Sequence, residues 1–219
     1  NNLKVRSVTD VRFDEYFGFT DAEVRSLLEY YGYPDCYDAA KKWYDGYHFG
    51  NVDVYCPWDV LNYCDSLLDD KDAQPENYWI NTSSNDAVKR FIEESADAAT
   101  KRELECLVAG EAITKEIHQE LTYAEIYQTI DNIWSLLFTT GYLTQRGRAE
   151  GRQMKLVIPN LEIRDIFVTQ IMEFFKENVR KDGDMLNRFC DALQNEDVEN
   201  VEKIFTEYLR KTISIRDTA

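Results

Sequence analysis

Apolar residues recur at helical spacing along most of this chain and alternate with polar residues in only a few short runs. The pattern predicts helices over 20–31, 36–44, 57–68, 98–109, 130–140 and 160–180, with one more carrying Val88, Phe91 and Ile92. Short extended runs are predicted at 3–8, 47–49, 53–55, 112–117, 142–148 and 152–158. Helices therefore dominate, and the strands are few and short.

Several boundaries are marked by residues that end or begin helices. Thr20–Glu23 and Thr122–Glu125 each have the spacing of a capping box, in which a hydroxyl and a carboxylate bind free backbone amides. Gly32 and Gly46 follow predicted helices, and Pro57 suits the first turn of the next one. These signals place the helix ends independently of the apolar pattern.

The apolar faces of two helices are predicted in detail. The helix that begins at Pro57 is expected to carry one apolar side, formed by Trp58, Val60, Leu61, Cys64 and Leu68. The long helix is expected to turn inward Leu161, Ile163, Ile166, Phe167, Ile171, Phe174 and Phe175.

The order of elements divides the chain into three parts. Residues 1–110 form a helical bundle with a small β-hairpin around Gly50-Asn51. Residues 111–181 follow the order strand, helix, helix, hairpin, helix, which is typical of a winged-helix domain. Residues 182–219 hold two further helices, 185–193 and 198–209. The expected fold class is mostly α.

The composition disfavours several classes of function and of site. The chain has 25 basic and 41 acidic residues, a net charge of −16, which disfavours general nucleic-acid binding but leaves room for a local basic patch. Five cysteines at irregular spacing indicate neither a disulfide framework nor a zinc site, so we expect a reducing, cytoplasmic setting. No apolar run has the length of a membrane span.

Five motifs occur in order along nearly the whole chain: FDEYFGFTDAEV, KKWYDGYHFGNVDVYCPWDVLNY, YWINTSSNDAVKRFI, NIWSLLFTTGYLT and LVIPNLEIRDIF. Together they resemble bacterial AAA-ATPase-like proteins, in which a P-loop ATPase region precedes a C-terminal PD-(D/E)XK nuclease-like domain. The resemblance implies that 1–110 is the helical lid region of the ATPase domain and that 182–219 is a linker. It also implies a P-loop core upstream of Asn1, a nuclease-like domain downstream of Ala219, and ATP and Mg as cofactors of the longer protein.

The catalytic parts of that family are not within this sequence. No run matches G-x-x-x-x-G-K-[ST], and no apolar strand ends in an acidic residue as a Walker B motif would. We therefore expect a non-catalytic fragment that is inactive alone, has no catalytic or metal-binding residues, and couples the ATP state of the core to the downstream domain. One departure is Cys56, where the family usually has the better helix cap Asn.

The stretch KWYDGYHFGN allows two interpretations. Asp45 and His48 could form the acid–base pair of a self-contained hydrolase, and Tyr47 and His48 could face a nucleotide as part of a lid. Alternatively Gly46 ends a helix, Gly50 helps turn a hairpin, and the aromatic rings pack against neighbouring helices. We favour the structural interpretation. A metal site at His48 is also not indicated, because no second histidine or cysteine lies near it in the sequence.

A polar cluster before the helix that carries Val88 raises a similar choice. Its side chains could hold an anion at the helix N-terminus, so four of them are nucleotide-facing candidates: Asn81, Thr82, Ser83 and Asn85. Helix capping alone also explains this composition, and we favour capping.

The predicted winged helix poses the question of DNA. The helix over 130–140 has no basic residue, so it is expected to be buried rather than to read bases. The predicted wing carries four basic residues that could bind phosphate: Arg146, Arg148, Arg152 and Lys155. A phosphate-backbone-binding module is therefore an alternative function, although such charges also protect strand edges. A third possibility is an interaction platform in a defence or mobile-element system, for which the sequence contains no specific signal.

Overall fold

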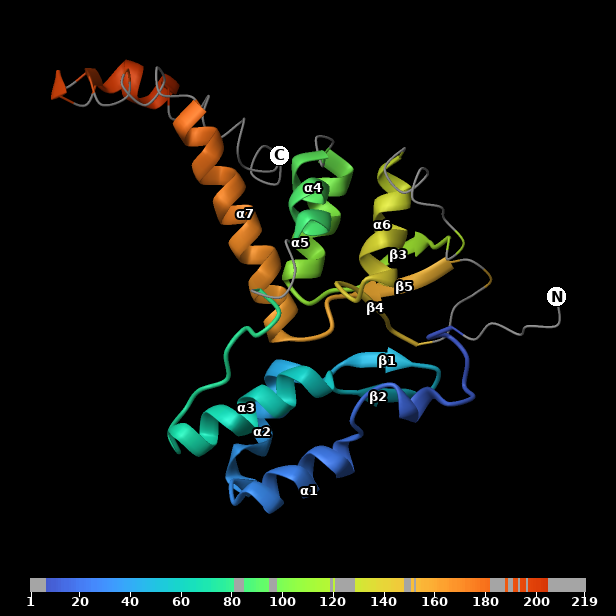
Figure 1. Cartoon of the computed structure of the whole chain (residues 1–219). Coiled ribbons are helices and arrows are strands. Elements are labelled where there is room, and N and C mark those ends of the chain that lie inside the picture. Colours follow the sequence, from blue (N-terminus) through green and yellow to red (C-terminus); the bar gives the residue numbers. More distant parts are fainter. Residues whose placement is uncertain are drawn as a thin grey trace.

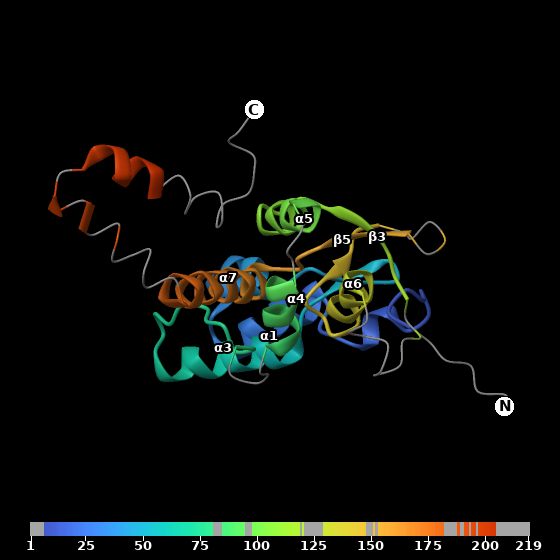
Figure 2. The same ribbon diagram turned by 90° about the horizontal axis from the view of Figure 1, so that it is seen from above.

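The computed structural model describes residues 7–80, 85–94, 98–118, 120, 129–147, 151, 153–181, 188, 191–192, 194–195 and 197–204. The fold is mostly α with two small antiparallel sheets, which confirms the predicted class. Figure 1 shows two groups of elements, one above the other, and Figure 2 shows them from above.

The lower group contains three helices and a hairpin. Its elements are α1 (Asp21–Tyr31), α2 (Tyr37–Tyr44), α3 (Pro57–Asp69), β1 (Tyr47–Phe49) and β2 (Val52–Val54), with 3-10 turns at Asp14–Tyr16 and Pro34–Cys36. They enclose a core cluster made of Val24, Leu28, Tyr37, Ala40, Tyr44, Tyr55, Val60, Tyr63, Cys64 and Leu67. The three helices thus close around their own apolar side chains.

The first helix begins and ends where the sequence predicts. The Thr20 hydroxyl accepts a hydrogen bond from the Glu23 amide at 3.4 Å, and the Glu23 carboxylate accepts one from the Thr20 amide at 2.8 Å. Gly32 caps the other end with φ at +86°, a left-handed conformation that suits glycine. The predicted capping box is confirmed.

The apolar face predicted for α3 is wrong in part. Val60 and Cys64 are buried, but Trp58, Leu61 and Leu68 are 55%, 43% and 58% exposed. Apolar residues occur on several sides of this helix, so their spacing alone does not select one face. Packing against α1 and α2 makes the selection and turns the three exposed side chains toward solvent.

The upper group contains four helices and a three-stranded sheet. Its elements are α4 (Asp86–Glu94), α5 (Ala98–Val108), α6 (Ile130–Thr139), α7 (Leu161–Lys181), β3 (Ile113–Glu116), β4 (Thr144–Gln145) and β5 (Gln153–Val157). The strand order is β3-β5-β4, with both pairs antiparallel. Within the described part of the strand predicted over 142–148, the strand β4 contains only Thr144 and Gln145, which are in register with β5.

A second core cluster joins this sheet to its helices. Phe91 of α4 packs edge-on against Trp134 of α6, with ring centroids 4.5 Å apart, and Phe167 of α7 is fully buried in the same cluster. Tyr47 and Val54 of the lower hairpin also belong to it. Because α4 and α5 share this core with β3, the packing does not mark a division at Gly110, and that boundary stays a prediction.

Some predicted elements lie outside the described residues. These are most of the extended run 3–8, the capping box at 122–125, most of the helix at 185–193, and residues 205–209. Residues 198–204 are helical, within the predicted range 198–209. None of the described helices combines the length and apolar character needed to cross a bilayer.

Candidate functional site

The stretch KWYDGYHFGN lies where the two groups of elements meet. It forms the end of α2 and the whole of β1, and its partner strand β2 pairs His48 with Asp53. Tyr44 is fully buried in the lower core and Tyr47 is 8% exposed in the upper one. The aromatic rings of this stretch therefore anchor the hairpin to both cores, in line with the structural interpretation.

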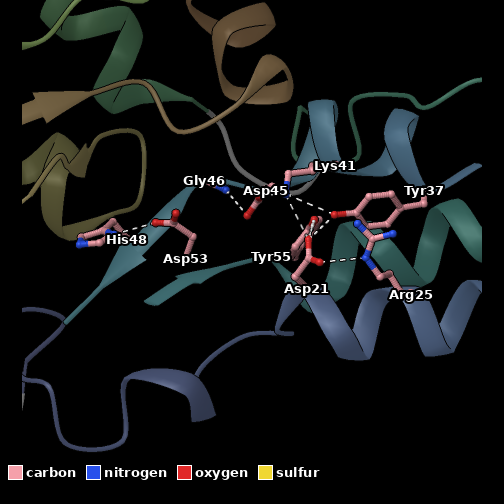
Figure 3. Close-up of polar contacts among 9 residues, drawn as sticks. All are labelled: Asp21, Arg25, Tyr37, Lys41, Asp45, Gly46, His48, Asp53 and Tyr55. Atoms are coloured by element: carbon pink, nitrogen blue, oxygen red, sulfur yellow. Dashed lines mark hydrogen bonds and ion pairs between the residues drawn. The ribbon is translucent and has the colours of Figure 1, made fainter. Parts of the chain in front are cut away.

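Asp45 and His48 do not come together as an acid–base pair. His48 Nδ1 lies 2.7 Å from Asp53 Oδ1 across the hairpin, whereas Asp45 accepts a hydrogen bond from the Gly46 amide at 2.7 Å. Asp45 also lies 3.7 Å from the ammonium group of Lys41, and Figure 3 shows it separated from His48 and Asp53. Burial raises the pKa of Asp45, and the hydrogen bond from the Gly46 amide partly offsets this rise. The pairing required by the hydrolase hypothesis is not present.

A polar cluster centred on Asp21 links α1 and α2 to the end of the hairpin. Its carboxylate accepts hydrogen bonds from the hydroxyls of Tyr37 and Tyr55, from Lys41 and from Arg25, as Figure 3 shows. The hydrogen bond from Tyr37, opposed by partial burial and supported by Arg25, holds the pKa of Asp21 well below its usual value. Asp21 and Asp45, which lies 3.7 Å from Lys41, together balance the two cations Arg25 and Lys41, so the cluster serves as a structural link.

Arg25 closes the outer side of this cluster. Its guanidinium lies 3.4 Å from the centre of the Tyr37 ring while its Nε donates to Asp21 at 3.0 Å. Asp21 could not be singled out from the sequence, since an acidic residue in the first turn of a helix is common on electrostatic grounds alone. Only the fold brings the two tyrosines to it.

Tyr44 and Tyr47 offer a test of the structural interpretation. The Tyr44 hydroxyl donates to the Glu76 carbonyl and accepts from the Glu76 amide, both at 3.0 Å, whereas the Tyr47 hydroxyl is buried with no hydrogen-bond partner among the described residues. We expect Tyr44→Phe to cost about 1–2 kcal/mol in the free energy of unfolding and Tyr47→Phe to cost about zero or to stabilise. Urea denaturation of both variants measures this difference. Equal losses would contradict it.

A cleft of about 250 Å³ opens beside the hairpin. Its walls come from the N-terminal segment, β1, β2, the end of α6 and Trp79, and they are mostly aromatic or aliphatic. The polar side chains among the described lining residues are the hydroxyls of Thr139, Thr140 and Thr144, the phenols of Tyr47 and Tyr55, and the thiol of Cys56. No described charged side chain lines it, so it offers no counter-charge for a triphosphate.

The predicted nucleotide-facing residues are only partly described. Asn81, Thr82 and Ser83 lie outside the described residues. Asn85 is 4% exposed, accepts a hydrogen bond from the Tyr142 hydroxyl at 2.9 Å and donates to the Ile80 carbonyl at 3.4 Å. Among the described nucleotide-facing candidates, the Asn85 side chain and the His48 ring have partners within the protein, and the Tyr47 hydroxyl is buried. Their fit to a nucleotide is poor, and that role stays a prediction.

The predicted wing is also partly described. Arg146 and Lys155 are both exposed. Arg146 directly follows β4, and its amide donates to the carbonyl of Lys155 in β5 at 2.7 Å, so the two residues lie opposite each other on the side of the turn that joins β4 to β5. Arg148 and Arg152 lie outside the described residues. On α6, Trp134 is fully buried and Ser135 is 1% exposed, as expected for a helix turned inward.

The group that sequence reasoning missed is a pair of buried carboxyls, Asp59 and Glu162, both fully inaccessible to solvent. Asp59 stands in the first turn of α3 and Glu162 in the first turn of α7. Glu162 Oε1 accepts hydrogen bonds from the backbone amides of Tyr78 at 2.7 Å and Trp79 at 2.9 Å. The pair therefore joins α3, α7 and the segment between α3 and α4.

Burial, together with the neighbouring Asp59, raises the pKa of Glu162 to about 8; burial also raises the pKa of Asp59. The Cys56 thiol lies beside Asp59, and burial raises its pKa to about 12. This thiol is therefore neutral and not a nucleophile at physiological pH. Within the part of the chain described, no group of three or more His, Cys, Asp or Glu side chains is arranged to hold a metal ion.

Comparisons with protein-family models, with curated proteins and with solved structures give no match to this chain. The resemblance to AAA-ATPase-like proteins therefore depends on the five motifs alone.

Proposed function

We propose that this chain is the lid and winged-helix part of an AAA-ATPase-like protein, and that it transmits the ATP state of a preceding P-loop core to a following nuclease-like domain. The chain itself contributes no catalytic group in this proposal. ATP and Mg belong to the longer protein, which acts in the cytoplasm. The motifs and their order support the family assignment.

The observation that carries the mechanical part is the joint between the two groups of elements. The hairpin contacts β4, α2 contacts α7, and the first turn of α7 holds the segment that leaves α3. Asn77 adds a hydrogen bond from its side chain to the Glu162 carbonyl at 3.1 Å. A displacement of the lower group would thus be passed to the base of α7.

The length of α7 suits it to carry such a displacement. It has 21 residues, about 30 Å at 1.5 Å per residue, and Figure 1 shows it projecting from the joint. Within the predicted bounds 111–181, the order β3, α6, β4, β5, α7 and the β3-β5-β4 sheet support the winged-helix assignment. In this proposal the helix is the lever that connects the lid to the following domain.

The proposal predicts that pure 1–219 does not hydrolyse ATP in the presence of Mg. The physical reason is that Asp45 and His48 have separate partners and that the cleft lacks a charged side chain among its described walls. Phosphate release is the measurement. Turnover that is lost in His48→Gln but kept in Asp53→Asn would contradict the proposal and support the hydrolase alternative.

The coupling itself is tested on a longer chain that includes the upstream sequence. Adding ATP is expected to change amide hydrogen exchange in the hairpin at 46–49 and at the base of α7, 159–163, together. A variant that weakens the joint, Asn77→Ala, should keep the change in the hairpin and reduce the change in α7. A change confined to the upstream sequence would contradict the proposal.

A further inference from the structure

The contact between Asp59 and Glu162 needs a proton. Glu162 Oε1 is occupied by two backbone amides, and no N–H group among the described residues donates to Glu162 Oε2 or to either oxygen of Asp59. Both side chains are fully buried, and their two carboxyls interact directly with each other. Two ionised carboxylates have no hydrogen to share, so one of the pair is protonated.

The distribution of donors assigns that proton to Glu162. Its Oε1 behaves as the carbonyl oxygen that accepts from Tyr78 and Trp79, which leaves Oε2 to carry the hydrogen toward Asp59. Asp59 is the ionised member, because it stands in the first turn of α3, where helix amides favour negative charge, and because the Cys56 thiol lies beside it.

Among the described residues, no cation is recorded that compensates the charge of the pair. The titratable groups recorded facing it are Cys56 from the start of α3, Tyr44 from α2, Tyr47 from β1 and Tyr78 from the segment before α4, with Glu76 and Tyr142 next to those tyrosines. None of them is cationic. A second negative charge placed there would be buried, unpaired and next to a like charge.

We propose that Asp59 and Glu162 form a proton-dependent latch that fastens the first turn of α7 to α3. With one shared proton the carboxyls attract, and Glu162 holds the amides of Tyr78 and Trp79. When that proton leaves, two buried carboxylates face each other, the contact becomes repulsive, and the joint opens. The latch concerns the joint alone and does not depend on the function proposed above.

The direction of the pH dependence follows from the raised pKa of Glu162, about 8 in the folded chain against a usual 4.5. The folded state holds the proton more tightly than the unfolded state, so the stabilisation is complete below about pH 4.5 and is lost as pH rises toward 8. One proton corresponds to about a tenfold fall in the folding equilibrium constant per pH unit in that window.

The test compares wild type with Glu162→Gln by urea denaturation from pH 5 to 9. The glutamine keeps a carbonyl for the two amides and an N–H for Asp59 but cannot titrate. We expect the ratio of the wild-type folding constant to that of Glu162→Gln to fall about tenfold per unit between pH 6 and 8. The exposed residue Glu173 on the same helix supplies the control, Glu173→Gln, whose ratio to wild type should stay constant.

Local opening is measured by amide hydrogen exchange at Tyr78 and Trp79. At pH 8.5 these two amides should exchange faster in wild type than in Glu162→Gln, while amides in the α1 interior exchange alike. A wild-type to Glu162→Gln ratio that is constant from pH 5 to 9, or equal exchange at both amides, would overturn the proposal.

If Glu162→Gln does not fold, the pH dependence of stability is measured on Asp59→Asn instead. It removes the like charge and so should lower the pKa of Glu162, moving the loss of stability to lower pH than in wild type. A profile for Asp59→Asn that coincides with wild type would show that the two carboxyls share no proton, and the proposal would then be rejected.

Discussion

Gly46→Ala is expected to destabilise the fold by about 2–5 kcal/mol, the sum of backbone strain and a steric clash. Gly46 has φ at +110°, a backbone conformation that residues other than glycine rarely adopt. A Cβ at this position would lie 2.1 Å from the carbonyl oxygen of Pro159. Pro159 lies two residues before α7, so the two groups of elements can approach this closely only at a residue without a side chain. Urea denaturation measures the loss.

Gly32→Ala is the matched control for this prediction. Gly32 has φ at +86°, but a Cβ at this position meets nothing within 4 Å. Its replacement is therefore expected to cost only the strain, about 1–2 kcal/mol. If both variants lose the same stability, the close approach of Gly46 to Pro159 contributes nothing and the joint is looser than described.

Glu162→Ala is expected to cost about 3–5 kcal/mol at pH 6, where the carboxyl pair is protonated once. The change removes the acceptor of the Tyr78 and Trp79 amides and leaves Asp59 buried without its proton donor. Each such group left without a partner in the interior costs about 1–3 kcal/mol. The free energy of unfolding from urea denaturation is again the measurement.

Two comparisons separate this effect from a general loss of side-chain bulk. Glu173→Ala removes an exposed carboxylate from the same helix and is expected to change stability by less than about 0.5 kcal/mol. Glu162→Gln keeps the acceptor and should lose much less than Glu162→Ala. If the alanine and glutamine variants are equally stable at pH 6, the amide contacts of Glu162 do not hold the joint.

The candidate site shows how far sequence reasoning reaches. The structural role of KWYDGYHFGN could be predicted because a helix end, a glycine and a two-residue turn are local events, and they recur as α2, Gly46 and the β1–β2 hairpin. The partner of His48 could not be chosen, because Asp45 and Asp53 are both near in sequence. Strand register selects Asp53.

The buried carboxyl pair could not be predicted at all. Asp59 and Glu162 are 103 positions apart, and each has the local pattern of an ordinary acidic residue in a first helical turn. Nothing in either segment indicates burial. The apolar face of α3 was mispredicted for a related reason, since the helix carries apolar residues on the side that faces solvent as well as on the side that packs.

What the sequence determined by itself is most of the described helices and the positions of their ends, as in α1, where Thr20, Glu23 and Gly32 act within a few residues of the backbone that they bind. Such interactions are complete within one turn and do not need the rest of the chain. Only the tertiary structure decided which carboxylate meets which partner and how the two groups join. Those contacts depend on the relative placement of α3, α7 and the hairpin, which the packing of two separate cores determines.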